Sequence, residues 1–161
     1  MNELEFLAGM EYPGRFIALG LTSEEVVVAV YGITGRSPSS RARKLVQEKN
    51  KIMVKPTDME TVSQGNLSLL IYPAMIFDGK TIVSNGTQTA ELAHDSSAYG
   101  DCLETLVETH RIWNYEPDSP IFTPRISGII ESKIDALGAI GIIRKSLSGA
   151  EKHYFEFPLQ I

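Results

Sequence analysis

Cysteine and histidine are scarce in this chain of 161 residues. The single cysteine, Cys102, cannot form an internal disulfide, and the three scattered histidines lack the spacing of a zinc site. No large excess of positive charge exists either. The net charge of −5 argues against broad electrostatic binding to nucleic acid, although it is compatible with a local basic pocket for one small anion. We therefore expect no metal and no nucleic-acid partner, and we favour a small-molecule ligand.

Long apolar runs are also missing. No stretch approaches the roughly 18 apolar residues that a membrane span needs, so no membrane partner is expected. The acidic start, residues 1–5, lacks the layout of a secretory signal and predicts a cytoplasmic location. Neither a Walker loop nor a dinucleotide fingerprint occurs, which disfavours ATP and NAD. The length and the 43% hydrophobic content suit one globular domain over residues 1–161.

The first half of the chain alternates apolar segments and turns. Strands are predicted over residues 15–21 and 25–31, paired as an antiparallel hairpin, and the second is dense in β-branched residues, which predicts burial. Residues 42–50 are polar apart from two positions and predict an irregular surface segment or one helical turn. A short strand over 51–55 should follow.

The strongest hairpin signal is Asp78-Gly79, which joins the apolar run over residues 66–77 to a predicted strand over 81–84. A helical region should begin at residues 87–93. Asp101 is then placed to cap an amphipathic helix that reaches about residue 113.

Prolines and apolar runs shape the last third. Three prolines within residues 115–125 exclude regular helix and predict a stiff, extended loop. Strands are expected over residues 126–130, 136–143 and 153–157. The run over 136–143 has no polar alternation, which is typical of a strand covered on both faces and predicts two sheets in contact. The fold class predicted is α+β with extensive antiparallel pairing.

The most distinctive loop, residues 31–41, follows a predicted strand and carries Arg36 and Arg41 together with Ser37, Ser39 and Ser40. Arginine forms bidentate, charge-assisted hydrogen bonds with phosphate, and the hydroxyls add neutral ones. The loop thus predicts a phosphate cradle. A solvated, turn-rich loop with both arginines in water stays open as the alternative.

Two further loops have similar ambiguity. Ser84, Asn85 and Gly86 offer an amide and backbone donors to a ligand, but Asn-Gly is also a common turn dipeptide. Thr123 and Arg125 flank a proline at a predicted strand entrance, where the arginine either lines a site or lies on the surface.

Two side chains with titratable groups stand out in apolar surroundings. Glu116 follows Trp113 and Tyr115, where burial would raise its pKa and suit a general acid or base; an exposed loop glutamate is the alternative. Tyr72 is expected in the middle of an apolar strand, so its hydroxyl must find a partner or sit at a cleft. His110, on the apolar face of the helix after residue 101, is interpreted as a packing or capping residue.

Taken jointly, residues 12–20, 31–41, 81–86 and 123–126 resemble the archaeal-type IMP cyclohydrolase family, in the same order and at similar spacing. The resemblance implies a four-layer α-β-β-α sandwich like that of the N-terminal-nucleophile hydrolases. It implies closure of 5-formamidoimidazole-4-carboxamide ribotide (FAICAR) to IMP with loss of water, without a metal or organic cofactor. It also implies a homo-oligomer.

The resemblance assigns catalysis to Arg41, Tyr72 and Glu116. It assigns substrate binding to the residues of the other shared motifs, namely Arg36, Ser84, Asn85, Gly86, Thr123 and Arg125. This agrees with the chemistry, because the attack of the carboxamide nitrogen on the formyl carbon develops an oxyanion. An arginine or a tyrosine hydroxyl can stabilise that charge, and a carboxyl group can relay the proton.

Three departures leave alternatives open. Asn2 would give no N-terminal nucleophile, so the mechanism of the N-terminal-nucleophile hydrolases does not match. Pro73 follows Tyr72 where the family leads us to expect a polar residue. The end at residues 158–161 precedes the family's usual end and indicates truncation at the C-terminus. The alternatives are a relative acting on another phosphorylated amide or ribotide, and a non-catalytic nucleotide-binding or assembly module.

Overall fold

The computed structural model describes residues 3–10, 14–60, 67–131 and 137–159. Several positions used above, such as Asn2 and the first residue of the strand predicted over 136–143, lie outside these ranges. The helices are α1 (Glu3–Ala8), α2 (Pro38–Arg41), α4 (Leu67–Leu70), α5 (Gln88–Asp95) and α6 (Cys102–His110). The strands are β1 (Arg15–Leu21), β2 (Val27–Ile33), β3 (Arg43–Glu48), β4 (Lys51–Pro56), β5 (Tyr72–Asp78), β6 (Lys80–Ser84), β7 (Arg125–Glu131), β8 (Leu137–Ser146) and β9 (Gly149–Pro158).

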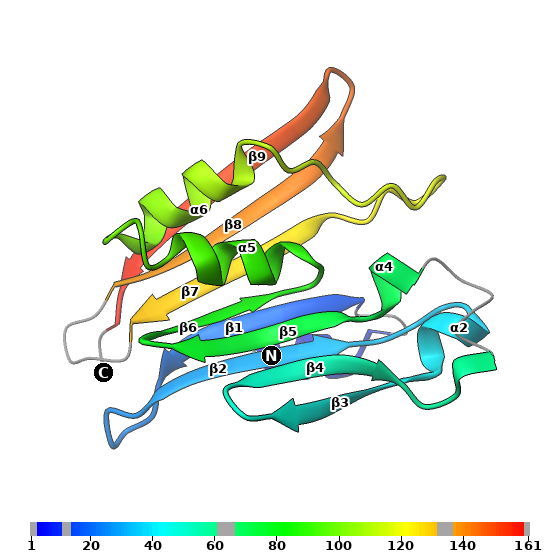
Figure 1. The fold of residues 1–161 in the computed structure, drawn as a ribbon, viewed down its shortest axis with the longest axis horizontal. Coiled ribbons are helices and arrows are strands. Elements are labelled where there is room, and N and C mark those ends of the chain that lie inside the picture. Colours follow the sequence, from blue (N-terminus) through cyan, green and yellow to red (C-terminus); the bar gives the residue numbers. More distant parts are fainter. Residues whose placement is uncertain (1–2, 11–13, 61–66, 132–136, 160–161) are drawn as a thin grey trace.

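The strands form two antiparallel sheets (Figure 1). In the larger sheet, the seven strands from β3 to β9 lie in chain order, each hydrogen-bonded to the next. In the smaller sheet, β1 and β2 form the predicted hairpin, in register from Arg15 opposite Ile33 to Leu21 opposite Val27. The predicted α+β class, the mainly antiparallel pairing and the contact between two sheets are confirmed.

The two faces of the seven-stranded sheet are covered by different partners. Helices α5 and α6 pack on one face, where Ile82 and Ile129 join Leu92 and Leu106 in an apolar core. The β1–β2 hairpin packs on the other face, because alternate residues of a strand point to opposite sides. Val83 accordingly belongs to the core between the sheets. The described layers are therefore two helices, the seven-stranded sheet and the hairpin.

The two sheets are in contact where β1 packs on β7. A Cβ on Gly128 would lie 2.9 Å from Leu19 Cδ1 and 3.0 Å from Ile17 Cδ1, so the ends of these two side chains would have to shift. Among the described helices, none is long and apolar enough to cross a membrane.

Four sequence predictions need correction. Residues 43–48 form strand β3 rather than an irregular segment; β3 lies at the sheet edge, where polar side chains face solvent and hide the strand pattern. Strand β2 begins two residues later than predicted and is mostly half-buried, with Val30 44% exposed. Tyr72 begins its strand, since α4 precedes it, and α6 ends at His110.

Strand β8 is covered unequally. Ala139 and Ile143 are fully buried, whereas Ile140 and Ile142, which point to the opposite face, are only half-buried. The prediction of a strand covered on both faces therefore holds completely for one face only. The two-stranded hairpin is too narrow to cover all seven strands, and β8 lies toward one edge of the sheet.

Pro73 lies in β5, an interior strand, where a residue without a backbone N–H interrupts the pairing. The register between β4 and β5 shifts between Ile52 and Met53, which faces Pro73. The irregularity adjoins Tyr72, so the proline shapes the strand end that carries this tyrosine.

Candidate active site

A cavity of about 770 Å³ opens at one end of the two sheets. Its walls come from the start of β1, the loop between β2 and β3, the first residue of β3, helix α4, the turn after β6 and the proline-rich loop before β7. Antiparallel neighbours bring these strand ends to the same edge. Segments far apart in the sequence therefore line one pocket.

An ion pair between Arg15 and Glu116 lies in the wall of the cavity. Arg15 Nη1 is 2.8 Å from both carboxylate oxygens of Glu116, whose side chain is 1% exposed. Burial raises the pKa of the Glu116 carboxyl group, and the Arg15 guanidinium opposes this effect. Burial lowers the pKa of Arg15, but Tyr72 and Glu116 more than offset it, so that the pKa lies above its ordinary value. The alternative of an exposed Glu116 is excluded.

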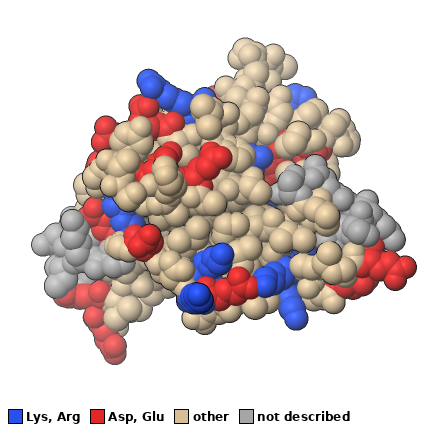
Figure 2. Space-filling view, viewed as in Figure 1, with Lys and Arg blue, Asp and Glu red and all other residues tan. Residues whose placement is uncertain are grey.

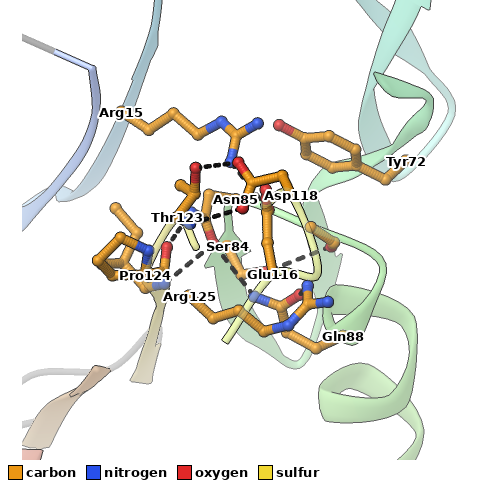
Figure 3. Close-up of polar contacts among 12 residues, drawn as sticks. Arg15, Tyr72, Ser84, Asn85, Gln88, Glu116, Asp118, Thr123, Pro124 and Arg125 are labelled. Carbon is orange, nitrogen blue, oxygen red and sulfur yellow. Dashed lines mark hydrogen bonds and ion pairs between the residues drawn. The ribbon is translucent and has the colours of Figure 1, made fainter. Parts of the chain in front are cut away.

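Two tyrosines meet next to this ion pair. The hydroxyl oxygens of Tyr31 and Tyr72 are 2.7 Å apart, and both side chains are buried. Figure 3 shows the Tyr72 ring pointing toward Arg15 and the Glu116 region. Burial raises the pKa of both phenols, while Arg15 partly counteracts this at Tyr72. Both hydroxyls therefore stay protonated near neutral pH, and one of them retains a proton to donate.

The turn after β6 braces the cavity wall. Asn85 lines the cavity, but its side chain is occupied: Nδ2 donates to the Pro124 carbonyl at 2.8 Å, and Oδ1 accepts from the Ile126 N–H at 2.9 Å. The hydroxyl groups of Ser84 and Thr89 form a hydrogen bond, and Ser84 is fully buried. Gly86 lies behind the wall, too. A Cβ there would be 2.6 Å from Arg125 Nη1.

Arg125 supports the same wall from behind. Its Nε donates to the Asn114 carbonyl and its Nη1 to Gln88 Oε1, both at 2.8 Å, and its guanidinium lies 4.6 Å from the centre of the Trp113 ring. The alternative of a surface arginine is excluded, since Arg125 is 5% exposed. Thr123 does line the cavity, and its N–H donates to Asp118 Oδ1 at 2.7 Å (Figure 3).

The predicted phosphate loop contains helix α2, which Ser37 caps through a reciprocal bond with Ser40. Arg36 and the serines of this segment line the cavity. Arg41 does not; its exposed side chain donates from Nε to the Gly35 carbonyl at 2.9 Å. Gly35 itself must be small, because a Cβ would lie 2.4 Å from the Ser40 backbone.

The structure thus separates the predicted site residues into three groups. Arg36, Asn85, Glu116 and Thr123 line the cavity, and Tyr72 adjoins it through Arg15. Ser84, Gly86 and Arg125 lie behind the wall. Arg41 lies outside the lining.

Sequence reasoning missed four residues that the structure brings to this site: Arg15, Tyr31, Arg43 and Asp118. Arg15 and Tyr31 belong to segments that carried the resemblance, so these segments held a signal. Arg43 was hidden because its segment was not interpreted as a strand. Its Nε donates to the Ser40 carbonyl at 2.8 Å, and burial lowers its pKa.

The positive character of the cavity is local. In Figure 2, acidic and basic side chains are scattered over the face that carries α5 and α6. The described cavity lining, by contrast, brings together three arginines, Arg15, Arg36 and Arg43, with Glu116 and Asp118. Fold and site together define an α+β protein in which the strand ends of two antiparallel sheets and the loops beside them line a cavity with several charged side chains, suited to a small, anionic ligand.

Comparison with known proteins identifies the family. The family model of the IMP cyclohydrolase-like proteins matches residues 12–156, and the chain belongs to this family. It is 30% identical to the IMP cyclohydrolase of Methanopyrus kandleri over 129 residues. This aligned region covers 80% of this chain and 63% of the relative. The chain is 28% identical over 130 residues to the IMP cyclohydrolase of Methanocaldococcus jannaschii, covering 80% and 61%. The chain therefore spans less than two thirds of the length of these relatives. The resemblance to the IMP cyclohydrolase family that the sequence indicated is confirmed.

Proposed function

We propose that this protein is an IMP cyclohydrolase, which closes FAICAR to IMP with release of water. The observation that carries the proposal is the buried Arg15–Glu116 pair beside the Tyr31–Tyr72 hydroxyls, at a cavity of about 770 Å³. That volume is within the range of about 300–1,000 Å³ typical of small-molecule sites. Membership of the IMP cyclohydrolase-like family supports the choice of substrate.

The reaction needs proton transfer and stabilisation of an oxyanion. The carboxamide nitrogen forms a bond with the formyl carbon and gives up one proton, and the formyl oxygen takes up a proton. The resulting hydroxyl group then leaves as water, with the proton of the formamide nitrogen, as the ring C=N bond forms. Two protons and one oxygen leave in total, which balances the loss of one water.

Each step has a candidate group in the cavity lining or next to it. Glu116, whose pKa is raised by burial, is suited to accept the carboxamide proton and return it to the leaving oxygen. The protonated Tyr72 or Tyr31 hydroxyl is suited to donate to the oxyanion. Because the ring closure is intramolecular, holding the ribotide in a fixed conformation supplies much of the remaining acceleration.

Arg41 enters the proposal on the resemblance alone. Arg41 directly follows Ser40 of the lining along the chain, and its Nε donates to the Gly35 carbonyl. The fourth, helical layer of a sandwich like that of the N-terminal-nucleophile hydrolases, a homo-oligomeric assembly and a cytoplasmic location also belong to this proposal. Family membership is their support.

An absorbance assay for IMP formation from FAICAR tests the function. Glu116→Gln and Arg41→Ala should each lower turnover by about 100-fold or more, the size expected when a proton-transferring or charge-stabilising group is lost. Glu151→Gln, on exposed strand β9, is the matched control and should keep wild-type turnover.

The same assay separates the alternatives. A wild-type chain that binds IMP tightly without turnover would favour a non-catalytic nucleotide-binding module. Turnover of another formylated or amide-bearing ribotide, without turnover of FAICAR, would indicate a divergent relative. Neither binding nor turnover would overturn the proposal.

A further inference from the structure

One nitrogen of the Arg43 guanidinium lacks a hydrogen-bond partner in the described part of the chain. Arg43 is the first residue of β3 and lines the cavity, where Nε is held by the Ser40 carbonyl at 2.8 Å. Its Nη1 is shielded from solvent and has no hydrogen-bond partner in the described part of the chain. A buried, unsatisfied donor of a charged group costs free energy, so native proteins seldom retain one. The position therefore calls for an acceptor that a ligand brings.

The charges around Arg43 indicate that this acceptor is anionic. Among the three described arginines of the lining, Arg15 is neutralised by Glu116. The other carboxylate of the lining, Asp118, accepts hydrogen bonds from the N–H and hydroxyl groups of Thr123. No ion pair joins Arg43 to a carboxylate within the residues that the structure describes. Its positive charge is consequently uncompensated.

The distribution of polar groups identifies the kind of anion. The hydroxyl-bearing residues Ser37, Ser39 and Ser40 lie in the lining with Arg43, on the segment that Nε of Arg43 fastens. Guanidinium and hydroxyl donors together match the several acceptor oxygens of a phosphate monoester. The loop before β7 contributes Glu116 and Asp118, whose carboxylate oxygens suit the N–H donors of a base. The two ends of a nucleotide thus have different favoured positions.

We propose that Arg43 binds the phosphate monoester of the nucleotide and, with the serines of residues 37–40, orients it so that the base faces Glu116. The identity of the base rests on the proposed function. Binding of the phosphate does not require turnover, so it is tested separately.

Calorimetric titration of the wild-type chain and Arg43→Gln with three probes tests this assignment. IMP and ribose 5-phosphate carry the phosphate monoester, and inosine does not. The affinity for IMP and for ribose 5-phosphate should fall about 10- to 100-fold in the variant, as for loss of a charged hydrogen bond. Binding of inosine should be the same in both proteins. An unchanged IMP affinity, or equal losses for IMP and inosine, would overturn the assignment.

Unfolding midpoints distinguish ligand binding from a structural role. Arg43→Gln loses the Nε–Ser40 hydrogen bond but also removes the buried Nη1 that lacks a partner, so the midpoint of the ligand-free protein should change little, while the rise in midpoint on adding IMP becomes smaller. Arg43→Lys, which keeps a charge, should restore part of that rise. Arg111→Gln, exposed at the end of α6, is the control and should change neither quantity. A destabilised ligand-free Arg43→Gln with intact IMP affinity would show a structural role instead.

The outcome is independent of the cyclohydrolase assay. Wild-type protein that binds IMP through Arg43 but does not close FAICAR would refute the proposed function and leave the phosphate assignment standing. Normal turnover of FAICAR, with a Michaelis constant that is unchanged in Arg43→Gln, would support the proposed function and refute the phosphate assignment.

Discussion

The two faces of the seven-stranded sheet differ in whether the core on that face is wholly apolar or continues into polar groups. Under α5 and α6, the core of Ile82, Leu92, Leu106 and Ile129 is completely buried, and these side chains are all apolar. Under the β1–β2 hairpin, the apolar core continues into the Tyr31–Tyr72 pair and then into the charged cavity. The same strands supply both faces, since Ile82 and Val83 are neighbours in sequence.

The difference lies in what the covering layer brings to the sheet. The two helices contribute apolar side chains, whereas the end of the two-stranded hairpin and the loops beside it bring charged groups together. Polar groups at that end are paired with one another across the gap, as Arg15 and Glu116 are. A closed face thus supplies stability, while an incompletely covered face leaves room for a site.

The largest expected effect comes from breaking the ion pair on the open face. Arg15→Met leaves the Glu116 carboxylate buried without its partner and should lower the free energy of unfolding by about 3–5 kcal/mol. Arg15→Met combined with Glu116→Gln removes the unpaired charge and should recover part of the loss. Urea unfolding measures both.

A matched surface pair provides the control for that experiment. Arg144 and Glu151 are also 2.8 Å apart but exposed, so Arg144→Met should lower the free energy of unfolding far less than Arg15→Met does. Equal costs for Arg15→Met and Arg144→Met would contradict the importance of burial.

The next effect concerns the closed face. Leu106→Ala opens a cavity in the core under the helices and should cost about 3 kcal/mol in urea unfolding, whereas Leu147→Ala, at a fully exposed turn, should cost almost nothing. IMP affinity of the folded Leu106→Ala protein should equal that of the wild type. A weakened affinity would mean that the two faces are coupled, contrary to the separation described above.

The smallest effect depends on pH. Burial, with repulsion from Lys152 and Arg125, lowers the pKa of His110 from 6.5 to about 4. As the pH falls below 6.5, the unfolded chain takes up a proton before the folded protein does, so stability is lost progressively between about pH 6.5 and 4. Between pH 7 and 5 the wild type should therefore lose about 2 kcal/mol more than His110→Gln.

The histidine experiment has an internal control. The side chain of His94 is 87% exposed, so His94→Gln should follow the wild-type pH profile. Unfolding free energies measured at each pH give the three profiles. Parallel profiles for wild type and His110→Gln would refute the contribution of His110.

Local signals made much of the fold predictable. The Asp78-Gly79 turn joins β5 and β6 as expected, and Asp101 caps α6 by accepting from the Glu104 N–H at 2.8 Å. Such features involve residues a few positions apart, so their physics is contained in a short window. Strand β3 was not predicted from local signals, because its side chains do not alternate clearly between apolar and polar. Even Leu45, an apolar residue of this edge strand, is 43% exposed.

The candidate site was predictable only in pieces. Glu116 was recognised from its aromatic neighbours, yet its partner Arg15 lies 101 positions away, and no local pattern connects them. Arg125 was noticed as an arginine at a strand entrance, but the sequence does not reveal that Gln88 and Trp113 hold it behind the wall. Pairing of charges across two sheets depends on the packed structure.

The chain-ordered pairing of β3 to β9 has a consequence for how the cavity comes into being. Each strand of that sheet pairs with its neighbour along the chain. Most of these pairs are close in sequence, whereas the pairing of β6 with β7 and the docking of the β1–β2 hairpin join segments far apart in the chain. Arg15 belongs to the docking hairpin and Glu116 to the body it docks on. The pocket is lined only after that docking, and its occupancy by a ligand therefore reports that folding is complete.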